Sequence, residues 1–164
     1  MKQLQILIDK VTNNIAYILS YMLILLIIIV FSSVFFRYVL SISYVILQEL
    51  IMYIHALIFM LGISYTLKEK AHVKIDIIYN ILTKENQNLV SSVGVLLFIL
   101  PTSLFISYIS LDMVFQSWRV LEGSSEAGGL NLVFILKSLI PLTGILIFFQ
   151  GLSELIKYRI MSDL

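Results

Sequence analysis

Few side chains in this sequence are of the types that do chemistry, and they are scattered among long apolar runs. There are no cysteines, so disulfides, thiolate catalysis and cysteine-ligated metal centres are excluded. Of the two histidines, His55 falls inside an apolar run and His72 in a polar stretch. One histidine cannot hold haem or zinc unaided, and no Gly-x-Ser-x-Gly motif accompanies the serines. We therefore interpret His55 as a hydrogen-bonded packing residue, and the sequence indicates no enzyme.

Two charged residues flank the short connection between the first two apolar runs. Arg37 ends the first run and Glu49 lies early in the second. Ionisable groups within a membrane are candidate functional sites. A structural ion pair across the hairpin is favoured, and a proton or ion relay is the alternative, although a relay needs a chain of such groups.

Composition defines the class of protein. Hydrophobic residues make up 60% of the 164-residue chain, charged residues 13%, and the mean hydropathy is +1.01. Soluble domains are about 45–50% apolar and about 25% charged. Lipid must therefore cover much of the surface. The net charge of +1 gives no case for binding nucleic acid.

The apolar runs predict an all-α integral membrane protein with one domain over residues 1–164. A spanning helix needs about 20 largely apolar residues. Four runs qualify, at residues 15–36, 44–67, 89–115 and 130–156. The runs are continuous rather than alternating, so helices are expected and a barrel is not.

Two further segments have one apolar and one polar helical face, at residues 2–14 and 75–84. Both are predicted to be interfacial amphipathic helices. Residues 122–129 are glycine-rich and expected to be flexible. Small residues recur at helical spacing in two spans, which indicates packing faces within the bundle or toward a partner: Gly62, Thr66, Ser103, Ser107 and Ser110.

The distribution of lysine and arginine predicts the orientation. Eight basic residues fall on one side of the four spans: Lys2, Lys10, Lys68, Lys70, Lys74, Lys84, Lys157 and Arg159. Only Arg37 and Arg119 fall on the other side. The basic side is usually cytoplasmic. Both termini and Lys70 are therefore expected in the cytoplasm, and Ser124 in the periplasm.

The stretch from Phe36 to Ile77 resembles a known family, the small DctQ-type permease subunit of tripartite ATP-independent periplasmic (TRAP) transporters. The family pattern has an Arg-Tyr pair ending the first span, an acid opening the second, a late glycine, and a His-hydrophobic-x-hydrophobic-Asp run. The matching residues are Arg37, Tyr38, Glu49, Gly62, His72 and Asp76. A later Pro141-x-x-Gly144 also resembles the family's last helix. The sequence departs from the family's tryptophan and paired acids at Leu47 and Gln48, and from a proline near Asn131.

The resemblance implies a subunit in a bacterial inner membrane that binds no cofactor. Its implied partners are a large membrane subunit, with which it forms a heterodimer, and a periplasmic substrate-binding protein. The large subunit would bind sodium and carry an organic acid, of the sialic acid or C4-dicarboxylate class, by an elevator motion. The six matching residues are candidates for structural or partner contacts. Arg119, Glu122 and Glu126 lie in the predicted periplasmic segment and are candidates for meeting the binding protein.

Two other classes remain as alternatives. An independent small channel or transporter should show pore-lining polar stripes or an inverted repeat, and none is evident in the sequence. A membrane anchor for a redox complex should show paired histidines within the spans.

Overall fold

The computed structural model describes residues 2–71 and 82–162, and within them it contains only helices, turns and loops. The elements follow one another as α1 (Lys2–Val39), α2 (Val45–Lys68), α4 (Lys84–Gly94), the π-helix η1 (Val95–Ile99), α5 (Leu100–Ile109), α6 (Leu111–Arg119) and α7 (Val133–Ser162). Four helical stretches are long and apolar enough to cross a membrane, which confirms the predicted four-span, all-helical architecture.

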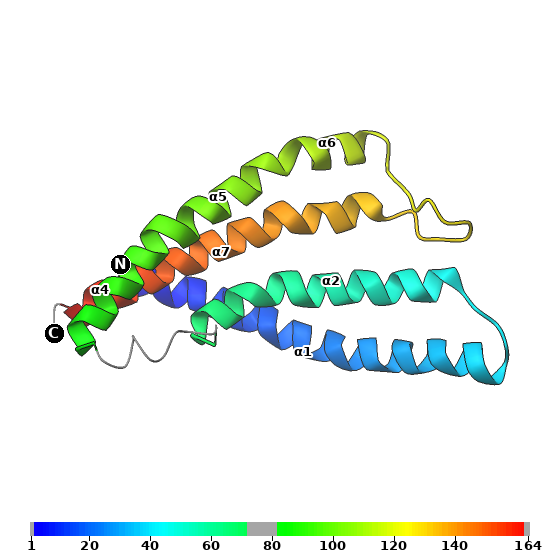
Figure 1. The fold of residues 1–164 in the computed structure, drawn as a ribbon, viewed down its shortest axis with the longest axis horizontal. Helices are drawn as coiled ribbons and strands as arrows, with labels where there is room; N and C mark the ends of the chain where they lie inside the picture. The colour runs from blue at the N-terminus through cyan, green and yellow to red at the C-terminus, as the bar shows by residue number, and fades with distance from the viewer. Residues whose placement is uncertain (1, 72–81, 163–164) are drawn as a thin grey trace.

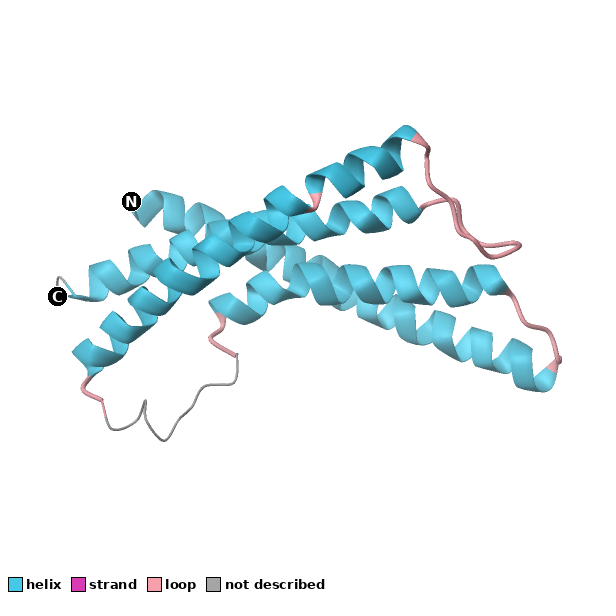
Figure 2. Ribbon diagram, turned by 45° about the horizontal axis from the view of Figure 1, so that its top comes forward, coloured by secondary structure: helices cyan, strands magenta, loops and turns pink. Residues whose placement is uncertain are grey.

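The four stretches form an elongated bundle of two antiparallel pairs (Figure 1). One pair is α1 with α2, and the other is the α4–η1–α5–α6 path with α7. Figure 2 shows both termini at the same end of the bundle, which we call the terminal end. The α1–α2 turn and the α6–α7 loop lie at the opposite end, called the loop end. Helix α7 contacts α1, α2 and every segment of the third stretch, so it is the centre of the bundle.

Several boundaries differ from the predicted ones. Residues 2–14 are not a separate interfacial helix, because α1 runs without a break from Lys2 to Val39. The last helix begins at Val133 rather than 130, since residues 130–132 belong to the preceding loop. Of the predicted interfacial helix 75–84, residues 75–81 lie outside the described part of the chain. Thr83 is the N-cap of α4, and its hydroxyl accepts a hydrogen bond from the backbone N–H of Asn86.

The third stretch changes its helical geometry just before Pro101. Proline has no backbone N–H, and its ring clashes with the carbonyl four residues earlier, here that of Leu97. That carbonyl lies in η1, where the Leu100 N–H bonds to the Val95 carbonyl, five residues back. The wider π turn accommodates the proline without ending the helix.

Small residues allow α5 and α7 to cross closely. Ser103 is buried, and the hydroxyl of Ser107 donates to the carbonyls of Ser103 at 2.8 Å and Pro141 at 3.4 Å. Opposite them, a Cβ atom at Gly144 would contact Ser107 and lie 2.7 Å from the Ser103 carbonyl oxygen. The serine spacing therefore marks a packing face within the bundle.

We expect Gly144→Ala to destabilise the protein, because the backbone of α5 would have to move away from α7. Overpacking of this kind typically costs about 1–3 kcal/mol. The measurement is the thermal melting midpoint in detergent. Gly94→Ala is the matched control, since a Cβ at Gly94 meets nothing within 4 Å. Equal midpoints for the two variants would contradict the close crossing.

Candidate functional site

The carboxylate of Glu49 fixes the α6–α7 loop at the loop end of the bundle. Glu49 lies in the second turn of α2 and accepts hydrogen bonds from the Ser124 hydroxyl and, at 2.5 Å, from the Leu130 backbone N–H. The Ser124 backbone N–H in turn donates to the Leu130 carbonyl at 3.0 Å. The two ends of the loop are thereby joined to each other and to α2.

Glycine is required where this loop meets the carboxylate. A Cβ at Gly129 would lie 2.6 Å from Glu49 Oε1 and 2.6 Å from Ser124 Cβ. The adjacent Gly128 has a φ of +80°, in the left-handed region that favours glycine. These glycines were expected to make the loop flexible. In the structure they instead allow the loop to fold tightly against Glu49.

The predicted ion pair between Arg37 and Glu49 is wrong. Both residues lie at the loop end, but within the described chain no ion pair joins them. Arg37 is exposed in the last turn of α1, next to the exposed Tyr38. The carboxylate of Glu49 instead accepts hydrogen bonds from neutral donors in the α6–α7 loop.

A second set of contacts joins α6 and the start of the α6–α7 loop to α7. Glu122 pairs with Lys137 at 2.5 Å, and this hydrogen bond lowers the pKa of the Glu122 carboxyl. The Trp118 indole donates to Ser138 at 2.8 Å and packs edge-on against Phe134. Glu122 was a candidate contact for a binding protein, but its carboxylate already forms an ion pair within the chain.

The remaining predicted residues are distributed as follows. Arg119 and Glu126 are exposed at the loop end, and Gly62 faces α1, where a Cβ added to it would lie 3.9 Å from Leu19. His72 and Asp76 lie outside the described residues. His55, expected to be a packing residue, is exposed on α2, and no hydrogen bond joins it to another described residue.

Sequence reasoning missed the main polar feature, a cluster joining α1 to α7 near the terminal end. Its members, here called the polar cluster, are Asp9, Thr12, Gln150, Ser153, Glu154 and Lys157. Gln150 and Ser153 are 0% exposed and Glu154 is 1% exposed. The α7 members follow i, i+3, i+4, i+7 spacing in an otherwise apolar helix, and that polar stripe was the available signal.

Asp9 is the centre of the polar cluster. Its Oδ1 accepts from Ser153 at 2.8 Å and from Gln150 at 3.1 Å, and its Oδ2 lies 3.1 Å from Lys157 Nζ. Gln150 also accepts from the Thr12 hydroxyl at 2.7 Å. Lys157 additionally pairs with Glu154 Oε1 at 2.5 Å, so one ammonium serves two carboxylates.

The packing of residues 2–14 is thus the reverse of an interfacial helix. The polar side, with Asp9 and Thr12, packs on α7 and Ile8 is also buried, while Leu4, Leu7 and Val11 are exposed. This arrangement suits a helix whose outer face meets lipid.

These contacts define a class of protein. Among the described residues, no group of three His, Asp or Glu side chains is placed to hold a metal ion. The polar cluster and the Glu49 carboxylate instead join elements of the chain to one another. The geometry is that of a four-span membrane protein whose polar contacts lie mainly within its own fold.

Comparison with known families gives the particular assignment. The model of the family described as "Tripartite ATP-independent periplasmic transporters, DctQ component" matches residues 26–159. The chain therefore belongs to this family and is a small membrane subunit of a TRAP transporter, a multi-pass inner-membrane protein and not an enzyme. A search of curated individual proteins finds no match.

We expect Glu49→Ala to loosen the α6–α7 loop, because the Leu130 N–H and the Ser124 hydroxyl lose their acceptor. Hydrogen bonds to charged groups contribute about 1.5–3 kcal/mol, so amide exchange at Leu130 should accelerate roughly tenfold to a hundredfold. Hydrogen–deuterium exchange measures this. Gln48→Ala, one residue away on the exposed side of α2, is the control. Unchanged exchange at Leu130 would show that Glu49 does not hold the loop.

We expect Lys157→Met to destabilise the terminal end, because it leaves Asp9 and Glu154 as two uncompensated carboxylates. Removing one partner of a buried ion pair costs roughly 3–5 kcal/mol. Denaturation in mixed micelles gives the change in the free energy of unfolding. Adding Asp9→Asn should restore part of the loss. Lys10→Met is the control, because Lys10 is an exposed charge on α1 beside Asp9. A loss of stability as large in this variant would show that Lys157 does not stabilise the polar cluster.

Proposed function

We propose that this chain is a static brace, enlarging the part of the transporter that stays fixed in the membrane while the large subunit moves an organic acid across it. The observation that carries the proposal is that Glu49 and most members of the polar cluster bind partners within the chain itself. Gln150 and Ser153 bond to the chain itself, and the Glu49 carboxylate is occupied by its own loop. Such a bundle suits mechanical support better than ligand transfer.

The substrate and its coupling ion then belong to the other subunits. An organic acid needs cationic or polar groups at the site that carries it, and sodium needs a set of oxygen ligands. We place both in the large subunit, and assign this chain no part in choosing between sialic acids and C4-dicarboxylates. Membership in the family favours this role over the two alternatives, an independent channel and an anchor for a redox complex.

One face of α2 is suited to the large subunit. Met52, His55 and Phe59 are exposed there, and the next residues at helical spacing are Gly62 and Thr66. Gly62 and Thr66 line a hollow of about 470 Å³ together with residues of α1, among them Ala16 and Ser20. Small residues let a partner helix approach closely. An imidazole facing outward in mid-span is also unfavourable in lipid, so a protein partner over this face would stabilise it.

The loop end is suited to the binding protein. The loop between α6 and α7 is fixed by Glu49 and presents Arg119 and Glu126 at the surface. Charges at the rim of an interface direct encounter more than they add affinity. A fixed loop presents them without an ordering cost.

This arrangement requires the loop end to be periplasmic and both termini to be cytoplasmic. The chain has no cysteine, so a single introduced cysteine is its only thiol. In whole cells, an impermeant maleimide should label Ser125→Cys and leave Lys70→Cys unlabelled until the membrane is opened. Ser125 is used because the Ser124 hydroxyl is bound to Glu49. Labelling of residue 70 from outside would reverse the orientation.

The brace role predicts that the interface with the large subunit does not move during transport. Cysteines at Met52 or Phe59, crosslinked to the large subunit, should leave organic-acid uptake in proteoliposomes within about twofold of the uncrosslinked complex. The physical reason is that a fixed contact does not slide during transport.

Gly62→Leu should weaken the complex by filling the hollow, with Gly62→Ala as the control. Crosslinks that preserve the complex but abolish uptake would make this chain part of the moving machinery.

A further inference from the structure

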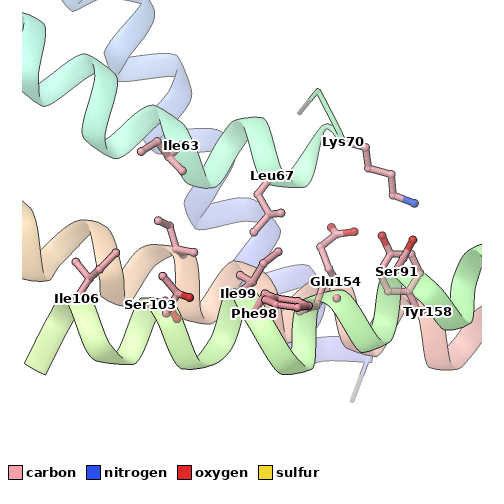
Figure 3. A pocket seen from close by; sticks show the side chains of 14 residues that line it. Ile63, Leu67, Lys70, Ser91, Phe98, Ile99, Ser103, Ile106, Glu154 and Tyr158 are labelled. Atoms are coloured by element: carbon pink, nitrogen blue, oxygen red, sulfur yellow. The ribbon is translucent and has the colours of Figure 1, made fainter. Parts of the chain in front are cut away.

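A cavity of about 590 Å³ lies between α2, the α4–η1–α5 helix and α7, toward the terminal end (Figure 3). Most of its lining is apolar and includes Ile63 and Leu67 of α2 and Phe98, Ile99 and Ile106 of the third stretch. Ligand cavities usually fall between about 300 and 1,000 Å³. The volume suits a small amphiphile.

One end of the cavity carries two opposite charges that are not paired with each other. Glu154 is 1% exposed, and its Oε2 has no hydrogen-bond partner although Oε1 pairs with Lys157. Figure 3 shows this carboxylate in the gap between the end of α2 and the third stretch. Lys70 lines the same end, with its Nζ 4.9 Å from the centre of the Tyr158 ring. Within the described residues, Lys70 forms no ion pair with an acid.

A buried carboxylate oxygen without a donor is unfavourable, and in membrane surroundings water does not readily satisfy it. The missing partner is therefore an N–H or O–H group, best a cationic one. Lys70 nearby suits an anion. A ligand that satisfies both has an ammonium and an anionic group close together, attached to an apolar chain.

We propose that this cavity binds one membrane phospholipid with an ethanolamine headgroup. Its ammonium donates to Glu154 Oε2, its phosphate lies near Lys70, and an acyl chain extends between Leu67 and Ile106. A choline headgroup fits less well because its quaternary nitrogen has no N–H to donate. A phosphatidylglycerol headgroup brings negative charge toward Glu154 without a compensating cation. This inference is independent of the brace role.

A helix of the large subunit is the other candidate occupant, and the size of the cavity disfavours it. A helix is about 10 Å across, so this volume would hold only about one and a half turns. A single acyl chain is far narrower and can follow the apolar lining.

The test uses the complex of this chain with its large subunit, stripped of lipid in detergent. The complex is titrated with dioleoyl phosphatidylethanolamine, phosphatidylcholine or phosphatidylglycerol, and bound lipid is counted by native mass spectrometry. We expect one tightly held phosphatidylethanolamine, preferred by about tenfold or more over either other lipid. Equal retention of the three lipids would overturn the headgroup assignment.

Two variants separate the cavity from the rest of the complex. Gly94 lines the cavity and a Cβ there meets nothing within 4 Å, so Gly94→Leu places a bulky side chain in the cavity and should abolish the bound lipid. Gly94→Ala is the control and should retain it. Glu154→Gln removes the charge and should reduce the preference for ethanolamine over choline to near onefold.

Two outcomes would reject the site. Unchanged lipid retention in Gly94→Leu would place the lipid elsewhere. A photo-crosslinking amino acid in place of the half-buried Ile106 provides the second check, because it should capture lipid. Capture of a large-subunit peptide at this position would show that the cavity is a protein interface.

Discussion

The bilayer offers no hydrogen-bond partners, and this constraint explains most of what is ordered in the structure. A buried polar side chain within a span is stabilised by a partner inside the protein, on its own helix or on another one. The contacts of Asp9 with Ser153 and Lys157 meet that requirement and join the first helix to the last. Because α7 also touches α2 and the whole third stretch, fixing α1 on α7 brings the two helix pairs together. Hydrophobic burial cannot do this in lipid, where apolar surface is equally well solvated.

The four spans and the serine packing face could be predicted because they depend on local properties of the sequence. A run of apolar residues long enough to cross the membrane is visible without knowing its neighbours, and so is the spacing of Ser103 and Ser107. The family resemblance added the subunit's place in a transporter, since the Arg37-Tyr38 pair and Glu49 are recognisable as a pattern.

The partners of the polar groups could not be predicted, because they lie far away in the sequence. Glu49 was assigned to Arg37, twelve residues earlier, whereas its donors are 75 and 81 residues further on. Asp9 lies in the segment 2–14 that was predicted to be an interfacial helix, whereas its partners are 141 and 144 residues away. Pairing over such separations depends on which helices pack together, and the sequence of one helix does not show which helix it packs against.

The π turn before Pro101 has a consequence for the rotational phase of the third stretch. One extra residue within a turn offsets everything after it by about 100° around the helix axis. Ser103 and Ser107 follow this turn and lie opposite Gly144. With uniform α-helical geometry, that small-residue face would point in a different direction around the helix axis. The π turn therefore influences which residues of α5 face α7. The spacing of the serines alone does not show this direction, because it depends on the helix geometry that precedes them.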